Sequence, residues 1–308
     1  MFLCGIKLFI MFSISSWLHL RIPFSYFLLP VYQFALAISP NPTNSAVLWT
    51  FLVIHIFLYP ASNGYNSYFD KDEKSIGGLK NPPPVNKGLY YLSLLFDAAA
   101  LLLGTVMINF TFAGMLFIYG LASKAYSHPA VRLKKYPVAG WLVAGFFQGF
   151  FTLLMSYIGI NKYALENLLQ PEILYAGALS SLMLWGSYPM TQIYQHEEDG
   201  ARGDETLSRM LGIRGTFYFV GIVFTAVTAA FAWYFVEYMG AEWAIAYAAA
   251  MAPVVLYFTY WFLLVYRNES AANYSRTMWL NFISATCLNV FFLLLFIIRS
   301  SYYNLLFN

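Results

Sequence analysis

Charged residues are scarce in this chain of 308 residues: only 10% are Asp, Glu, Lys or Arg, and 60% are hydrophobic. A soluble domain carries about 25% charged residues, so this chain cannot cover a water-exposed surface. The composition excludes an intrinsically disordered chain. With a net charge of only +3, it also excludes nucleic acid as a partner, because phosphate contacts need a dense basic surface.

Cysteine is almost absent, with only Cys4 and Cys287 in the chain. The pair shows neither a disulfide pattern nor the spacing of metal ligands. A secreted scaffold held together by disulfides is therefore excluded.

Long apolar runs dominate what remains, and we predict an all-α membrane protein with nine spanning helices. A helix needs about 20 mostly apolar residues to cross the hydrocarbon core, and continuous runs of this kind do not fit the alternating strands of a barrel. The predicted spans are residues 22–39, 45–63, 89–108, 110–125, 137–159, 172–193, 215–235, 243–265 and 278–298.

The N-terminal residues 1–18 are also apolar. We expect an interfacial segment here in preference to a signal peptide, because no small-residue cleavage site follows. The whole chain, 1–308, is then one transmembrane domain with two cytoplasmic motif loops, at 64–88 and 194–214.

Positive charge orients the predicted spans. Loops after the second, fourth, sixth and eighth spans hold most of the 17 Lys and Arg residues, namely Lys71, Lys74, Lys80, Lys87, Lys124, Arg132, Lys134, Lys135, Arg202, Arg209, Arg214, Arg267 and Arg276. By the positive-inside rule these loops are cytoplasmic. We therefore expect a multi-pass protein of the inner (plasma) membrane with its N-terminus in the cytoplasm. Arg21, at the start of the first span, is expected to be an interface anchor.

The few acidic residues gather at the cytoplasmic ends of two predicted spans. Most of the 14 Asp and Glu residues lie there: Asp70, Asp72 and Glu73 after the second span, and Glu197, Glu198, Asp199, Asp204 and Glu205 after the sixth. Ionisable residues at membrane depth are costly and usually functional. We therefore expect a site at these positions.

Each acidic group ends a helical stripe that begins with two amides. Asn63, Asn66 and Asp70 are spaced i, i+3, i+7 and share one helix face. The second group repeats this order with Gln192, Gln195 and Asp199. Because spans two and six differ by four, we infer two four-helix halves around a central cavity, plus a ninth helix, with the stripes facing each other.

The side chains at these positions suit a magnesium–phosphate ligand. Mg²⁺ prefers one or two carboxylates together with substrate phosphates. The basic loop after the fourth span supplies counter-charge for a phosphate through Lys124, Arg132, Lys134 and Lys135. Opposed Mg²⁺ sites beside a basic loop, over an aromatic-rich membrane cavity, indicate a lipid diphosphate site.

Three stretches resemble the UbiA-type intramembrane prenyltransferase superfamily. They are NGYNSYFDKDEKSIGGLKNPP (63–83), AYSHPAVRLKKYP (125–137) and YQHEEDGARGDETLSRMLG (194–212). The resemblance covers essentially the whole chain. It implies a helical fold similar to that of soluble prenyl synthases, and transfer of an isoprenoid from a diphosphate to a lipophilic acceptor. It also implies Mg²⁺ held by two Asp-rich motifs.

The first family motif, Asn-Asp-x-x-Asp-x-x-x-Asp, is matched in part. Asn66 and Asp70 match, whereas the remaining two Asp positions hold Ser67 and Lys74. Asp72 and Glu73 lie close enough in sequence to replace the lost ligands.

The second family motif, Asp-x-x-x-Asp followed by Gly and Thr-Leu, is also matched in part. The matching residues are Asp199, Gly203, Thr206 and Leu207. Gln195 replaces the first Asp, and Glu198 is its expected substitute. In the basic loop, the residues that fit the family pattern are Tyr126, Ser127, Pro129, Arg132 and Lys134.

The resemblance then assigns roles to these positions. Metal ligands are expected at Asp70, Asp72, Glu73, Glu198 and Asp199. Binding of an isoprenyl diphosphate is expected from Asn66, Gln195, Lys124, Tyr126, Arg132 and Lys134. Asp70, Asp199, Arg132 and Lys134 are the expected catalytic residues. The acceptor, a lipophilic molecule in the bilayer, is not specified by any residue.

Three alternatives stay open at this point. A transporter with an internal repeat would place its polar site near the membrane midplane, whereas these acids lie at one membrane face. An intramembrane terpene cyclase and a non-catalytic isoprenoid-binding homologue fit the same residues. The missing Asp residues keep the non-catalytic homologue in consideration.

Overall fold

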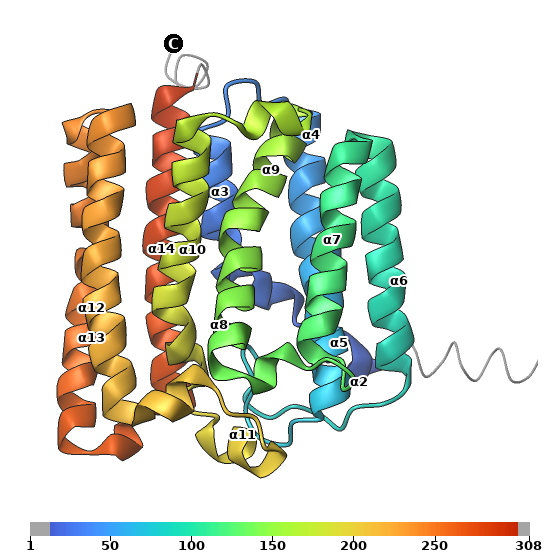
Figure 1. Ribbon diagram of the computed structural model, residues 1–308, viewed down its shortest axis with the longest axis vertical. Helices are drawn as coiled ribbons and strands as arrows, with labels where there is room; N and C mark the ends of the chain where they lie inside the picture. Colours follow the sequence, from blue (N-terminus) through green and yellow to red (C-terminus); the bar gives the residue numbers. More distant parts are fainter. Residues whose placement is uncertain (1–12, 301–308) are drawn as a thin grey trace, which may run out of the picture.

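The computed structural model describes residues 13–300, and its regular elements there are helices apart from one bridge between Ile76 and Leu79. Figure 1 shows the long helices running side by side, with the short α11 (His196–Arg202) at one end of the bundle. The long helical runs are Asn44–Asp70 (α4, η2, α5), Gly88–Ile108 (α6, η3), α7 (Phe110–Ser127), Pro137–Asn161 (α8, η5, α9), α10 (Pro171–Gln192), α12 (Leu207–Tyr238), α13 (Ala241–Arg267) and α14 (Tyr274–Arg299). The shorter elements are α2 (Ile14–Leu20), η1 (Ile22–Phe27), α3 (Leu29–Ala37), η4 (Leu133–Lys135), η6 (Leu165–Leu168) and η7 (Glu269–Ala271).

Six of the described helical runs are long and apolar enough to cross a membrane. They are Asn44–Asp70, Gly88–Ile108, Pro137–Asn161, Leu207–Tyr238, Ala241–Arg267 and Tyr274–Arg299. The helices α7 and α10 also run the length of the bundle in Figure 1 but are not among the six. The all-helical membrane architecture is confirmed, and the count of nine spans stays a prediction.

The first predicted span, residues 22–39, is not one continuous helix. It consists of η1 and the nine-residue α3, each of which carries a proline in its first turn. Proline lacks the N–H that would continue a preceding helix, so Pro23 and Pro30 divide this segment. Of the predicted N-terminal interfacial segment, residues 1–12 lie outside the described residues, and α2 begins at Ile14.

Both motif segments are more helical than predicted. The second span continues to Asp70, so residues 64–70 of the predicted loop belong to α5, which ends where Lys71 adopts φ 51°. The seventh span begins at Leu207 instead of residue 215, and Gly212 with φ 70° kinks it. A residue with positive φ cannot continue a right-handed helix, so these positions fix where the chain turns.

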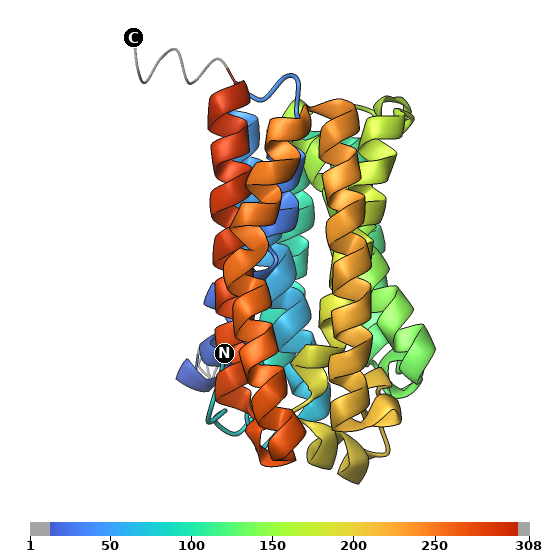
Figure 2. The ribbon, with the colours of Figure 1, turned by 90° about the vertical axis from the view of Figure 1, so that its left-hand side faces the viewer.

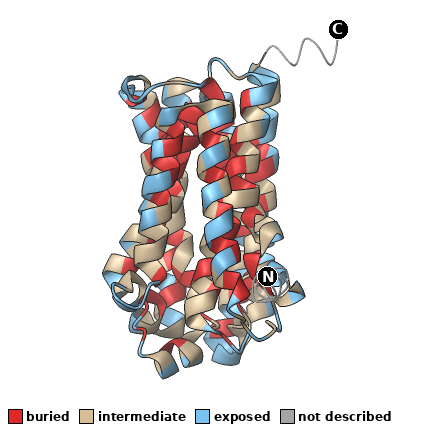
Figure 3. Cartoon of the chain, turned by 90° about the vertical axis from the view of Figure 1, so that its right-hand side faces the viewer, coloured by how far each residue is buried: buried red, intermediate tan, exposed pale blue. Residues whose placement is uncertain are grey.

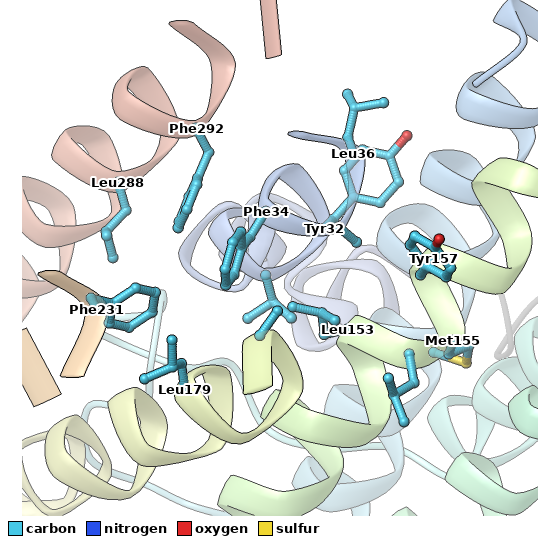
Figure 4. Packing of buried hydrophobic residues seen from close by; sticks show 14 of the residues in the cluster. Tyr32, Phe34, Leu36, Leu153, Met155, Tyr157, Leu179, Phe231, Leu288 and Phe292 are labelled. Carbon is cyan, nitrogen blue, oxygen red and sulfur yellow. The ribbon is translucent and has the colours of Figure 1, made fainter. Parts of the chain in front are cut away.

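The interior of the bundle is packed with aromatic and aliphatic side chains. In Figure 4, Phe34 of α3 stacks on Phe292 of α14, and their ring centroids are 4.6 Å apart. The ring centroid of Phe231 on α12 lies 5.7 Å from that of Phe34. Figure 3 shows this buried interior beneath outward-facing exposed residues. Exposed apolar side chains on spanning helices face lipid instead of water. The core thus holds one bundle together around the site.

Candidate active site

A cavity of about 570 Å³ lies inside the bundle and is lined by both acidic segments. At one end its lining is polar and charged, with Arg21, Asn63, Asn66, Asp70, Asp72, Lys134, Gln192, Gln195, Asp199, Arg202 and Asp204. Farther in, the lining is apolar and aromatic, including Val31, Tyr119, Phe147, Leu184, Phe224, Met251, Phe258 and Leu288. A charged mouth that leads into an apolar arm suits an amphiphile with an anionic head.

The two predicted stripes meet in this cavity. Asn63, Asn66 and Asp70 lie on α5, whereas the second stripe is formed by Gln192 at the end of α10, by Gln195 and by Asp199 on α11. All six side chains line the same space. Figure 2 shows α11 at the same end of the molecule as the end of α5. Segments about 130 residues apart in the chain therefore form one polar surface.

Positive side chains join the carboxylates of the two segments. Lys134 pairs with Asp70. Arg132 donates two hydrogen bonds to Asp204, from Nε to Oδ1 at 2.9 Å and from Nη2 to Oδ2 at 2.8 Å. The side chains of both carboxylates are buried: that of Asp70 is 5% exposed and that of Asp204 is 3% exposed. Buried charges persist in proteins when they are paired and hydrogen-bonded.

Backbone turns with positive φ bring these cations to the acids. Arg21, Lys71 and Arg132 all have φ between 45° and 51°, a conformation that is uncommon for residues other than glycine. Lys71 turns the chain directly after Asp70, and Arg132 precedes η4, which carries Lys134. Strained backbone of this kind is often found at functional sites.

The 71–79 loop contributes Asp72, Ile76 and Gly77 to the cavity lining and is held by α11. The Glu198 carboxylate accepts hydrogen bonds from the backbone N–H groups of Glu73 and Lys74, at 3.1 and 2.9 Å. Ile76 of this loop is buried and lines the cavity. Glu73 itself is exposed. The structure therefore places Glu73 and Glu198, both predicted metal ligands, outside the cavity lining, where Glu198 holds the loop instead.

Replacing Glu198 with alanine is expected to loosen the 71–79 loop. A hydrogen bond to a charged group contributes about 1.5–3 kcal/mol, so exchange of the Glu73 and Lys74 amide protons should accelerate by about 10- to 100-fold. Hydrogen–deuterium exchange measures this effect. The matched control is Glu197→Ala, which removes only an exposed ion pair with Lys74 and should leave exchange nearly unchanged. Equal acceleration in both variants would show that Glu198 is not the anchor.

Two predicted diphosphate-binding cations also lie elsewhere. Lys124 pairs with Asp97 of α6, and its ammonium lies 5.1 Å from the ring centre of Tyr65. It does not line the cavity among the described residues. Arg132 likewise does not line it; its guanidinium pairs with Asp204 and lies 3.7 Å from Asp70, and both of these carboxylates line the cavity. Lys134, by contrast, lies on the cavity surface.

Burial and neighbouring charges shift the pKa values of Asp199 and Asp204, both in the second segment, in opposite directions. Burial raises the pKa of Asp199 to about 6, although the charges of Arg202 and Lys134 oppose this shift. Burial also acts to raise the pKa of Asp204, but the hydrogen bonds from Arg132 and the charge of Lys134 lower it overall. Asp199 is thus a buried carboxylate with incomplete compensation.

The raised pKa of Asp199 predicts a pH-dependent stability of the metal-free protein. The folded state retains a proton that the unfolded state loses near pH 4, so the contribution of Asp199 to stability falls as pH rises through 4 to 6. The free energy of unfolding of the wild type relative to Asp199→Asn should therefore fall by roughly 1 kcal/mol between pH 5 and pH 7. Denaturant titration at both pH values checks this, and a rise in the difference would contradict it.

Aromatic residues continue the cavity beyond the charged mouth. The hydroxyl groups of Tyr126 on α7 and Tyr188 on α10 lie 2.6 Å apart, and both side chains line the cavity. Phe147 and Tyr119 lie deeper in the lining, with ring centroids 6.1 Å apart. Aromatic faces attract cations by about 0.5–2 kcal/mol each. The wall therefore combines an apolar surface with electron-rich faces.

Three charged cavity residues were missed as site residues from the sequence: Arg21, Arg202 and Asp204. Arg202 lies three residues after Asp199, so their spacing on one helix was an available signal. Asp204 belonged to the acidic group but matched no family position. Arg21 donates to the Gly77 carbonyl at 3.1 Å and to Asn63 Oδ1 at 3.3 Å. The Gly77 contact depends on the folded 71–79 loop, and neither contact has a sequence signal.

The donor set of the mouth fits a hard cation. The carboxylates of Asp70, Asp72 and Asp199 and the amide oxygens of Asn66 and Gln195 are oxygen donors of the kind that Mg²⁺ prefers. The raised pKa of Asp199 shows that the fixed cations leave part of its negative charge uncompensated. Within residues 13–300, no group of three or more His, Cys, Asp or Glu side chains is gathered around a common metal position. The donor types suit a magnesium ion that takes few carboxylates and completes its shell with ligand oxygens.

Comparison with known proteins gives consistent matches to one family. Residues 27–283 match the UbiA prenyltransferase family. Among curated proteins, none matches significantly. Among solved structures, a UbiA homologue from Archaeoglobus fulgidus bound to GPP and Mg²⁺ is 15% identical and has a TM-score of 0.64, with 92% of this chain and 99% of that chain covered.

Two further solved structures are similar. The same Archaeoglobus fulgidus homologue bound to DMAPP and Mg²⁺ is 15% identical with a TM-score of 0.65, and the match covers 92% of this chain and 99% of that one. A digeranylgeranylglyceryl phosphate synthase is 18% identical with a TM-score of 0.59, and the match covers 92% and 98% of the two chains. At these identities the likeness shows a shared fold.

Proposed function

Because this chain belongs to the UbiA prenyltransferase family, we propose that it transfers a prenyl group from an isoprenyl diphosphate to a lipophilic acceptor within a membrane. One observation carries the proposal: both acidic segments and the Lys134 ammonium line a single cavity that continues into an apolar arm. The solved homologues bound to GPP or DMAPP with Mg²⁺ support the same ligand class. The enzyme is then a transferase of alkyl or aryl groups other than methyl.

The charged mouth is the proposed place for the diphosphate. Asp70 and Asp199, with Asp72 beside them, would hold Mg²⁺, and the amides of Asn66 and Gln195 would complete its surroundings. When bound, Mg²⁺ would supply Lewis-acid stabilisation of the departing pyrophosphate. Lys134 and the partly buried Arg21 line the cavity and donate to phosphate oxygens in this proposal.

Ligand binding would require an exchange of ion pairs. In the structure the carboxylates of the mouth are paired with Lys134 and Arg202. The Lys134 ammonium would become available to phosphate oxygens as the Asp70 carboxylate turns to Mg²⁺. Such an exchange keeps each buried charge paired, which avoids the cost of an unpaired buried charge.

The aromatic wall would shelter the allylic cation. Tyr126 and Tyr188 lie between the carboxylates and the apolar arm. Both tyrosines interact electrostatically with Asp70 and Asp199. Their rings, with Tyr119 and Phe147, would stabilise positive charge and exclude water. The acceptor would attack from the apolar side and release a proton.

We further propose that the protein resides in the inner (plasma) membrane with its N-terminus in the cytoplasm.

The proposal is tested with the purified full chain in lipid nanodiscs. Radiolabelled geranyl, farnesyl and geranylgeranyl diphosphates are offered with Mg²⁺ and a lipid extract of the source cells. We expect pyrophosphate release that depends on Mg²⁺ and on the extract, together with a labelled lipid product. Release without any extract would favour the terpene cyclase, and binding without release would favour the non-catalytic homologue. Labelled solute carried across proteoliposomes without release would favour the transporter.

A further inference from the structure

Arg202 bridges the two acidic segments with one guanidinium. Its Nη1 donates to Asp72 of the first segment, and its Nη2 donates to Oδ1 of Asp199 in the second segment at 2.7 Å. Its Nε lies 3.5 Å from Oδ2 of Asp204. The side chain lines the cavity and is 20% exposed. It is therefore both fixed by three carboxylates and open to a ligand.

This guanidinium occupies a position that would suit a second metal ion. Carboxylates from opposite segments that share one cation are the arrangement expected of a bridging divalent ion. Here Asp72 and Oδ1 of Asp199 are engaged by Arg202, and Asp204 is engaged by the fork of Arg132. Opposed Mg²⁺ sites, as expected from the sequence, would have to compete with these guanidinium groups for their ligands.

Arg202 also has the chemistry to bind a phosphate directly. A guanidinium is planar, always charged and matched in geometry to two phosphate oxygens. Its three carboxylate partners hold it in one place, so little conformational freedom would be lost on binding. The side chain lines the same cavity as Lys134, which pairs with Asp70. The two cations therefore belong to the same charged mouth.

We propose that Arg202 is a fixed diphosphate-binding cation that takes the place of one divalent ion, so that the chain binds a single Mg²⁺ with each diphosphate. The inference rests on the proposed function of the cavity. It predicts that the metal count depends on Arg202. Removal of the guanidinium frees Asp72 and Oδ1 of Asp199, and a second divalent ion can then bind between the segments.

The test counts bound metal instead of product. The full chain in nanodiscs is saturated with the unreactive geranyl S-thiolodiphosphate and titrated with Mn²⁺, whose free fraction is measured by electron paramagnetic resonance. We expect one bound Mn²⁺ in the wild type and two in Arg202→Gln. With Mn²⁺ limited to one equivalent, the variant should bind the analogue about 10- to 100-fold more weakly.

Two further variants keep the test decisive. Arg214→Gln, which removes a half-exposed pair with Glu269, should keep one Mn²⁺ and the wild-type affinity. Arg202→Lys retains the charge without the fork and should keep one Mn²⁺ with weakened analogue binding. Two Mn²⁺ ions in the wild type overturn the inference even if Arg202→Gln does not fold, as does an unchanged count and affinity in a folded Arg202→Gln. A wild type that binds neither metal nor analogue refutes the proposed function as well.

Discussion

The double substitution Asp70→Asn with Asp199→Asn is expected to lower Mg²⁺-dependent pyrophosphate release by about 10³-fold or more. Each change is nearly isosteric, but together they remove the two carboxylates that the cavity places on opposite segments. Lys134 loses its carboxylate partner in the same variant. The rate is measured with a labelled isoprenyl diphosphate at saturating Mg²⁺, and wild-type release by the double variant would eliminate the mechanism.

The matched control makes the same change of charge outside the cavity. Glu73→Gln with Glu197→Gln also removes two carboxylates from the two segments, but both side chains are exposed. This control should retain release within a few-fold of the wild type. The single variants Asp70→Asn and Asp199→Asn should each lose nearly as much as the double variant, because residues that act on one complex are not additive.

Replacing Arg132 with methionine is expected to have the largest effect on stability. The Asp204 side chain is only 3% exposed, and the change removes the guanidinium that donates two hydrogen bonds to it. Loss of one member of a buried ion pair costs about 3–5 kcal/mol. The free energy of unfolding, measured by denaturant titration of the purified protein, should fall by that amount. Arg132→Lys should recover part of the loss, because it restores the charge without the fork.

A double-mutant cycle separates the interaction energy between Arg132 and Asp204 from other effects of the substitutions on stability. Arg132→Met with Asp204→Asn should be less destabilised than the sum of the two single variants, because the pair then loses both charges. The control Arg214→Met breaks an exposed pair with Glu269, each side chain about half exposed, and should change stability by less than about 1 kcal/mol. Strict additivity in the cycle would show that the fork does not stabilise the fold.

Helical phase carried much of what the sequence could predict about the site. The i, i+3, i+7 spacing placed Asn66 and Asp70 on one face, and the structure has them on one face of α5, lining the cavity. Gln195 and Asp199 also line the cavity, but the helix breaks between α10 and α11, so a single helical face does not account for their placement. Helical spacing is a local property, and the fold preserves it where the helix is continuous, as in α5.

Sequence proximity was a poor guide to which neighbouring acid faces the cavity. Glu198 precedes Asp199, yet Asp199 lines the cavity while Glu198 binds the backbone of the 71–79 loop. The direction of each side chain depends on how that loop folds against α11, which no local pattern encodes. For the same reason Lys124, near the basic loop in sequence, pairs with Asp97 of a neighbouring helix.

The most direct test of the central claim is an experimental structure of the full chain with Mg²⁺ and an unreactive isoprenyl thiolodiphosphate. The account predicts a diphosphate in the charged mouth, with carboxylate oxygens of both Asp70 and Asp199 about 2.0–2.1 Å from a magnesium ion that also contacts its phosphates. The prenyl chain should lie along Tyr126 and Phe147. A diphosphate bound elsewhere, or one whose metal touches neither carboxylate, would contradict the account.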